Sequence, residues 1–183
     1  LQLFVVMPLM LKLIGRLNPM QWLRKMPEVW LFAFATSSSN ATLPVNLRVC
    51  EERLGINNRV AAFTIPLGAT INMNGTVMMQ GIATVFIAQL YGVDLTLTQL
   101  LTVVGMATIA AVGTAGVPSA GMVMLASVLA QVGLPVEAIG IILSVDRLLD
   151  MARTVVNVSG DAAVACIVAH SEDQLDREIY DGP

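Results

Sequence analysis

Charged side chains are scarce in this sequence of 183 residues. They make up 13% of the chain, whereas 56% of the residues are hydrophobic. Soluble domains carry roughly 25% charged residues. The composition therefore excludes an ordinary soluble domain and indicates an integral membrane protein. We expect the chain to be surrounded by a lipid bilayer and to have no nucleic-acid partner.

Cysteine and histidine are almost absent. Cys50 and Cys166 belong to no Cys-x-x-Cys motif, so the sequence predicts neither a disulfide scaffold nor a cysteine metal site. We interpret both as small packing residues. The single histidine, His170, precedes an acidic and polar segment, 171–183, that we expect to be a solvated tail. His170 is interpreted as an interfacial residue without a role.

The first residues do not predict a signal peptide. The apolar run 1–14 has no charged n-region before it and no small-residue cleavage site after it. It is too short for a full span of ~20 residues, so we expect a truncated transmembrane helix and a chain that is a fragment. Residues 21–25 then combine Trp22 with Arg24 and Lys25, which is typical of a membrane interface.

Two short apolar arms flank a polar segment in the first third of the chain. Residues 27–34 and 45–54 are the arms, and residues 36–42 are the polar tip, which Pro44 follows. Each arm covers about half a bilayer at ~1.5 Å per residue. We predict a re-entrant hairpin with Pro44 in the first turn of its second arm. An ordinary helix-loop-helix at the surface is the alternative.

Two long charge-free stretches follow. The first, 60–93, exceeds one span and is interrupted by Pro66, Gly68 and the segment 72–76. We predict a broken transmembrane helix whose freed carbonyls and Asn side chains can bind a hard cation; a kinked helix with satisfied amides is the alternative. The second, 95–136, is divided near its middle by a Gly/Pro-rich tip and predicts a second re-entrant hairpin with a movable tip.

Polar residues recur at helical spacing in the last apolar stretch. They are Asp146, Asp150, Arg153, Asn157 and Asp161. Residues three or four apart share a helix face, and ionisable residues in membrane helices usually face a protein interior or an aqueous cavity. We name this row the seam and predict that it binds an anionic, zwitterionic solute and cations. A seam of internal ion pairs, such as Asp146 with Arg147, is the alternative.

Basic residues are distributed asymmetrically. None lies between Asp94 and Glu137. Apart from Arg147 and Arg153 in the last apolar stretch, the others fall before the first hairpin, between it and the broken helix, or in the tail, namely Lys12, Arg16, Arg24, Lys25, Arg48, Arg53, Arg59 and Arg177. The positive-inside rule places those loops and the C-terminus in the cytoplasm. The two hairpins then enter from opposite faces, which makes an inverted repeat, as in secondary transporters. The predicted fold is an all-α integral membrane protein.

Four segments resemble signature motifs of one family. They read SSSNATLP at 37–44, NMNGT at 72–76, GTAGVP at 113–118 and DMARTVVNVSGD at 150–161. In this order they are similar to the dicarboxylate/amino acid:cation symporters, which include archaeal aspartate transporters and the excitatory amino acid transporters. The resemblance implies that residues 1–170 are the C-terminal part of a transport domain. It also implies a missing N-terminal scaffold, a homotrimer and a cell-membrane location.

The resemblance assigns roles to the seam and to the tips. Arg153 is expected to bind the side-chain carboxylate of aspartate or glutamate, Asp150 the ammonium group, and Asp146 to support Arg153. The expected substrate contacts are Ser39, Thr76, Val117, Gly121, Asp150, Arg153, Thr154 and Asn157.

The same resemblance implies two sodium sites. The first would use Asp161, the regions of Asn72 and Asn157, and the Gly68 carbonyl. The second would use carbonyls near Thr70, Ala111, Val112 and Thr114, and would form when the second hairpin closes. A closing lid would thereby couple sodium, the co-transported ion, to the substrate.

Three positions depart from the family pattern. Asn74 stands where Asp is usual, which puts a third sodium site in doubt. Met151 stands where excitatory transporters have a second Arg, and Gln80 stands where they have a proton-carrying Glu.

The predicted function is sodium-coupled symport of an acidic amino acid.

Other functions stay open at this point. A carrier of this kind could take a C4-dicarboxylate or a cystine-like substrate. A passive anion channel is a different class. An enzyme with a nucleophile among Ser37 to Ser39 would need a base, and His170 is predicted too far from mid-depth to act as one.

Overall fold

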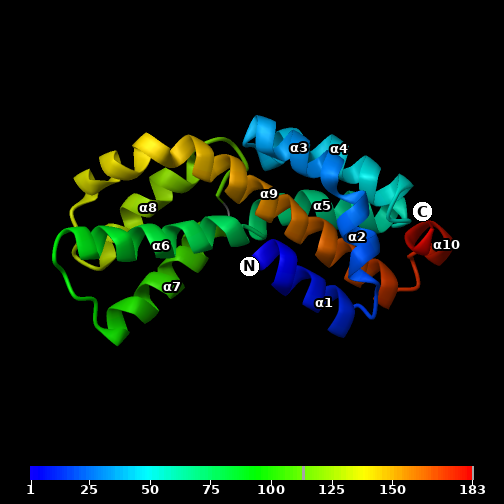
Figure 1. Cartoon of the computed structure of the whole chain (residues 1–183), viewed down its shortest axis with the longest axis horizontal. Coiled ribbons are helices and arrows are strands. Elements are labelled where there is room, and N and C mark those ends of the chain that lie inside the picture. The colour runs from blue at the N-terminus through cyan, green and yellow to red at the C-terminus, as the bar shows by residue number, and fades with distance from the viewer. Residues whose placement is uncertain (113, 183) are drawn as a thin grey trace.

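The computed structural model describes residues 1–112 and 114–182, and the regular secondary structure of the described part is helical apart from one isolated bridge between Ile56 and Leu175. Gly113, at the start of the predicted second tip, and Pro183 lie outside the described residues. Figure 1 shows how the helices are arranged. Their bounds are η1 Gln2–Val6, α1 Met7–Leu13, α2 Pro19–Lys25, α3 Pro27–Thr36, α4 Ser39–Glu52, α5 Asn58–Ile71, α6 Asn74–Leu90, α7 Leu97–Ala111, α8 Ala120–Gln131, η2 Val136–Ala138, α9 Ile139–Ser171 and α10 Arg177–Asp181.

Helix α9 is the axis of the molecule. It runs through both halves of the elongated structure, with α6, α7 and α8 around its first half and α1 to α5 around its second half (Figure 1). Each half has its own apolar core. Together with the preceding η2, α9 spans residues 136–171. Among the described residues, this is the one helix that is long and apolar enough to cross a membrane. The predicted final helix is confirmed.

Helices α3 and α4 form the first predicted hairpin. The turn between them is shorter than expected, because only Ser37 and Ser38 are outside the helices. Ser37 adopts a left-handed φ of 50°, and the Ser38 hydroxyl accepts a hydrogen bond from the Ala41 amide at 3.1 Å, which starts α4 early. Pro44 therefore lies in the second turn of α4, and its placement in the first turn was wrong.

The predicted broken helix is present as α5 and α6. The break is confined to Asn72 and Met73, whose backbones are not helical. The expected interruptions at Pro66 and Gly68 do not occur, since α5 continues through both to Ile71. The arms of the second hairpin are α7 and α8, joined by residues 112–119.

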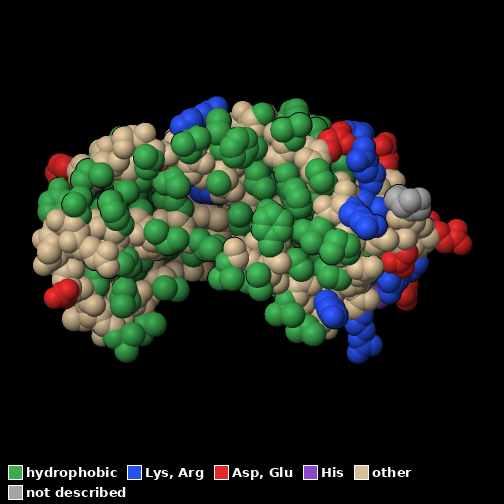
Figure 2. Space-filling view, viewed as in Figure 1, with side chains coloured by type: hydrophobic (Ala, Val, Ile, Leu, Met, Phe, Trp, Pro, Cys, Tyr) green, Lys and Arg blue, Asp and Glu red, His purple; other side chains and the backbone are tan. Residues whose placement is uncertain are grey.

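The C-terminal segment departs from a solvated tail. Most of its side chains are exposed, but Tyr180 of α10 is fully buried and its hydroxyl donates to the Asn18 carbonyl at 3.0 Å. Lys25 of α2 donates to the carbonyls of Ile179 and Tyr180 at 2.6 and 2.9 Å. We call this contact of α2 with α10 the clasp. Charged side chains gather at this end of the molecule (Figure 2).

Candidate functional site

The seam is a buried row on α9. Its five side chains, Asp146, Asp150, Arg153, Asn157 and Asp161, are at most 5% exposed. They are buried because the break between α5 and α6 and the tips of both hairpins cover this face of α9. Arg147 is exposed, so the alternative of an Asp146–Arg147 ion pair finds no support. The predicted sharing of one inward face is confirmed.

Arg153 and Asp150 form an ion pair at the centre of the seam. The Arg153 Nε donates to Asp150 Oδ1 at 3.0 Å, and Nη2 contacts the same oxygen. The Arg153 Nη1 is buried and has no hydrogen-bond partner among the described residues. A buried guanidinium nitrogen without a partner is unfavourable. This nitrogen is therefore available to an incoming anion.

Asn157 joins the helix break to the seam. Its Oδ1 accepts a hydrogen bond from the Gly75 amide at 2.8 Å, and its Nδ2 donates to the Thr76 hydroxyl at 3.3 Å. Gly75 lies so close to α9 that an added Cβ would be 2.5 Å from the Arg153 carbonyl oxygen. The first turn of α6 can approach the seam this closely only with glycine at position 75.

The tips of the two hairpins meet over the seam. The Ser38 hydroxyl and the Asn40 amide both donate to the Gly116 carbonyl, at 2.7 and 3.0 Å. A Cβ at Gly116 would be 2.8 Å from Asn40 Oδ1 and 3.1 Å from the Ser39 Cβ, so the two tips approach each other closely here. The tips thereby close the space above Arg153 and Asp150.

The enclosed cavity has a volume of only about 10 Å³. That is roughly the room for a single water, so an amino acid enters only if a tip moves. All of the predicted substrate contacts line this cavity, namely Ser39, Thr76, Val117, Gly121, Asp150, Arg153, Thr154 and Asn157. The structure brings them together, and their individual roles stay predictions.

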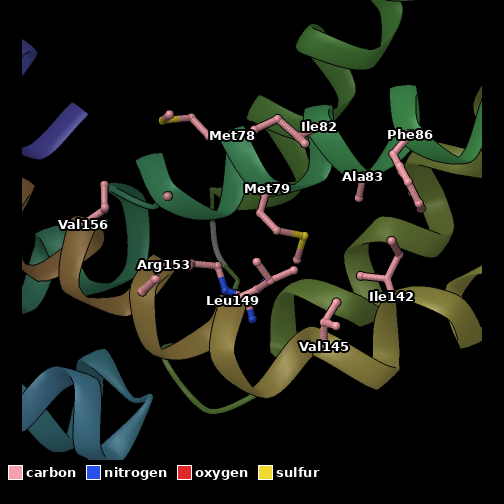
Figure 3. Close-up of a pocket in the computed structure, with 12 residues that line it drawn as sticks. Met78, Met79, Ile82, Ala83, Phe86, Ile142, Val145, Leu149, Arg153 and Val156 are labelled. Carbon is pink, nitrogen blue, oxygen red and sulfur yellow. The ribbon is translucent and has the colours of Figure 1, made fainter. Parts of the chain in front are cut away.

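A larger groove lies beside this cavity, between α6 and α9 (Figure 3). Its volume is about 420 Å³, and its lining is apolar except for Arg153. Met79, Leu149 and Phe86 are among the side chains that face it. It has no carboxylate or amide side chain to orient an ammonium group. The small polar cavity is therefore the better candidate for an amino acid site.

The first predicted sodium set is also brought together. Asp161 is 2% exposed, and its Oδ1 accepts a hydrogen bond from Asn72 Nδ2 at 2.8 Å. Gly68 packs against it, and a Cβ there would be 2.5 Å from Asp161 Oδ1. No Lys or Arg of the described residues pairs with this carboxylate. A buried carboxylate without a cationic partner fits the oxygen ligands that a hard cation prefers. Asn72 presents its amide nitrogen to Asp161, and the Gly68 carbonyl accepts the Asn72 backbone amide at 2.8 Å.

The second predicted sodium set, made of carbonyls near Thr70, Ala111, Val112 and Thr114, stays a prediction. Thr70 and Val112 are exposed, and the Thr70 hydroxyl donates to the Leu67 carbonyl in its own helix. The Ala111 carbonyl accepts the Thr114 amide at 3.2 Å. Within residues 1–112 and 114–182, no hydrogen bond joins Thr70 to the second tip. Asn74 opens α6, half-buried. The roles of these residues stay predictions.

One site residue was missed from the sequence. Ser119 contacts both Asp146 and Asp150, and Asp146 lies nearer to its hydroxyl, at 3.0 Å, than to Arg153 Nη2, at 3.9 Å. The available signal was a serine next to Pro118 in a Gly/Pro-rich tip. Its type predicts a turn or cap, but nothing in the local sequence tells which way the hydroxyl turns.

Comparisons with known proteins show what this sequence is similar to. The model of the Sodium:dicarboxylate symporter family matches residues 1–171. Excitatory amino acid transporter 2 of Homo sapiens is 46% identical over 173 residues, which cover 94% of this chain and 30% of that protein. Excitatory amino acid transporter 3 of Mus musculus is 48% identical over 158 residues, 86% of this chain and 30% of that protein. A Caenorhabditis elegans excitatory amino acid transporter is 46% identical over 173 residues, 94% of this chain and 34% of that protein. The chain spans about a third of the length of these relatives.

Proposed function

Because this chain belongs to the sodium:dicarboxylate symporter family, we propose that it forms the binding core of a carrier that moves an acidic amino acid together with Na⁺. The relatives are named as transporters, and the proposal is accordingly a carrier and not an enzyme. Alternating access is the proposed mechanism, with the second hairpin as the lid.

The observation that carries the proposal is the Arg153–Asp150 pair inside the closed cavity. Arg153 and Asp150 form an ion pair with each other, and Nη1 of Arg153 has no hydrogen-bond partner among the described residues. An acidic amino acid offers Arg153 a carboxylate and Asp150 an ammonium group, so both charges can exchange one partner for another without losing charge compensation. Arg153 suits this exchange because a planar guanidinium binds a carboxylate with two parallel hydrogen bonds.

Sodium coupling is supported by the buried Asp161. Its carboxylate has an amide but no cationic side chain beside it among the described residues. Asn157, one helical turn away, holds the start of α6 and also lines the substrate cavity. A cation at Asp161 would stabilise the break at Asn72, and the break positions Thr76 in the cavity. Sodium would then raise the affinity for the substrate, and the substrate would raise the affinity for sodium by the same factor.

The finer arrangement in the membrane is part of the proposal. The paired arms of both hairpins are too short to span alone, which supports re-entrant insertion from opposite faces as an inverted repeat. The gathering of charge beside α2, α4 and α10 supports a cytoplasmic C-terminus (Figure 2). We place the complete protein in the plasma membrane as a homotrimer, with the scaffold supplied by the rest of the chain.

Uptake by the complete protein in proteoliposomes tests the proposal. Labelled aspartate should accumulate with an inward sodium gradient and not with a potassium gradient. Arg153→Ser should abolish this uptake, because nothing else in the cavity binds the side-chain carboxylate. The matched control is Arg147→Ser, which removes an exposed arginine from the same helix and should leave uptake unchanged. Uptake that ignores sodium, or that survives Arg153→Ser, would refute the proposal.

Asp150 separates the proposed substrate from a dicarboxylate. A dicarboxylate without an amino group has no use for a carboxylate beside Arg153. Asp150→Asn should therefore weaken aspartate binding by at least roughly ten-fold, the loss expected for one charge-assisted hydrogen bond. Competition by succinate should become stronger in this variant. Equal loss of both ligands would instead assign Asp150 to support of Arg153.

A further inference from the structure

The tip of the second hairpin touches the seam through Ser119. The Ser119 amide donates to Asp150 Oδ2 at 2.8 Å, and the Ser119 hydroxyl donates to Asp146 Oδ2 at 3.0 Å. Both carboxylates are 3% exposed. A single residue of the tip therefore bonds the two acidic side chains at the outer end of the seam.

The direction of the Ser119 hydroxyl is unusual for its position. Ser119 is the N-cap residue of α8, where a serine side chain commonly accepts a hydrogen bond from the second or third helical amide. Ser119 makes no such cap bond and turns its hydroxyl to α9 instead. Its backbone is left-handed, with φ of 60°, a conformation that residues other than glycine seldom adopt. Contacts with α9, and not capping of α8, therefore explain the conformation of Ser119.

The contact lies outside the substrate cavity. Neither Ser119 nor Asp146 lines that cavity, and Ser119 is exposed on its outer side. The other Asp146 oxygen, Oδ1, is buried and has no hydrogen-bond partner among the described residues. Ser119 thus supplies the shortest described contact of Asp146, and this contact can open to solvent without disturbing the apolar cores.

We propose that the Ser119 hydroxyl and the Asp146 carboxylate form a latch that holds the second hairpin closed. Both are positioning residues, because they set the balance between open and closed tip without touching the substrate. The inference rests on the proposed function only in taking this hairpin as the lid. The latch requires a neutral donor at position 119, since an acid there would be repelled by Asp146 and Asp150.

Substitution of Ser119 by asparagine and by aspartate makes a matched test. Both replacements are similar in size and both tolerate a left-handed backbone. The side-chain amide introduced by Ser119→Asn could donate an N–H to Asp146, whereas Ser119→Asp would add a like charge.

In the complete protein, spin labels at Ala115→Cys in the tip and Arg147→Cys on α9 report the opening, because both positions are exposed and Cys50 and Cys166 are buried.

Without sodium and aspartate, the original protein and Ser119→Asn should give one short distance, and Ser119→Asp a longer one. Ser119→Ala should raise the open-to-closed ratio about three- to ten-fold, as expected for one hydrogen bond. Asp146→Ala should add nothing further in the Ser119→Ala background, since both changes remove the same contact. Equal distances in Ser119→Asn and Ser119→Asp, or full additivity of the two alanine changes, would overturn the latch.

The measurement is independent of transport. If the complete protein failed to take up aspartate, the proposed function would fall, while the distances would still decide whether the latch exists. In transport, loss of the latch should speed the release of bound aspartate by the same three- to ten-fold. The unfolding temperature should fall only slightly in Ser119→Ala, because one hydrogen bond is lost and the apolar cores are untouched. A large fall would point to a structural role and contradict the latch.

Discussion

Arg153 illustrates how a single buried charge is kept stable and still available. Burying an ion pair compensates the loss of hydration only if the partners are well placed, and removing one partner costs about 3–5 kcal/mol. Asp150 supplies that partner, while Nη1 of Arg153 remains without one among the described residues. The guanidinium is thus held in place and still offers a donor. A residue that binds an anion requires both features, here the Nε bonded to Asp150 and the Nη1 left without a partner in the described part of the chain.

Gly75 provides a residue-scale prediction. A methyl group at this position would lie 2.5 Å from the Arg153 carbonyl oxygen and 3.1 Å from its Cα, both backbone atoms that cannot turn aside. Gly75→Ala should push the start of α6 away from α9 and break its bond with Asn157. We expect aspartate affinity to fall by at least about ten-fold, because the first turn of α6, which lines the polar cavity, is displaced. Calorimetry on the complete protein measures this affinity.

Gly81 is the matched control on the same helix. No atom lies within 4 Å of a Cβ added there. Gly81→Ala should therefore keep the affinity and gain up to about 1 kcal/mol of stability from helix propensity. A Gly75→Ala protein that binds as tightly as Gly81→Ala would show that the close approach of α6 does not shape the site.

At the scale of elements, the structure shows how interrupted helices assemble a polar site inside an apolar protein. The end of α5 and the starts of α6 and α8 lie at the seam, where Asn72, Gly75 and Ser119 bond Asp161, Asn157 and Asp150. Helix ends carry amides without partners in their own helix. Gly75 and Ser119 use such amides to bond Asn157 and Asp150. The breaks therefore serve the site with backbone groups that an intact helix would hide.

Gly116 carries a prediction about the two tips. A Cβ would meet Asn40 Oδ1 at 2.8 Å and the Ser39 Cβ at 3.1 Å. Gly116→Ala should separate the tips and speed dissociation of labelled aspartate several-fold, measured by rapid filtration. Gly105→Ala in α7 is the control, because nothing lies within 4 Å of its added Cβ. Dissociation that is equally slow in both variants would mean that the tip contact does not retain the substrate.

Much of this arrangement can be predicted from the sequence, and the remainder has physical reasons. Apolar runs locate the arms, and helical spacing locates the seam, because both depend on local periodicity. The widths of the breaks could not be predicted, since the Ser38 cap extends α4 and α5 tolerates Pro66. The meeting of Ser38 with Gly116 depends on residues far apart in sequence. Such contacts follow from tertiary packing and not from local pattern.

At the scale of the whole molecule, the clasp holds α10, which follows α9 in the chain, against α2. The C-terminal segment also pairs with the loop after α4, where the Asn57 amide donates to the Gln174 carbonyl and the Asp176 amide to the Gly55 carbonyl, at 2.9 and 2.8 Å. The C-terminal segment therefore bonds α2 through α10 and the loop after α4 through Gln174 and Asp176, at the charged end of the molecule.

Tyr180 makes the clasp sensitive to alkaline pH. Burial raises the pKa of its hydroxyl above the usual value of ~10. The neutral form is thus favoured in the folded state, so its contribution is present below pH ~10 and is lost as the pH rises through the folded pKa. The unfolding temperature should fall above pH ~10, and Tyr180→Phe should reduce this fall. Tyr91→Phe, at an exposed tyrosine, should not change it.

The central claim is that one polar unit on α9 binds both an acidic amino acid and sodium. The most direct test is the affinity of the complete protein for aspartate, measured by calorimetry over a range of sodium concentrations. Affinity should rise steeply with sodium in the original protein, and this dependence should weaken in Asp161→Asn while Arg153 is intact. An aspartate affinity independent of sodium, or a sodium dependence that is the same in Asp161→Asn, would contradict the claim.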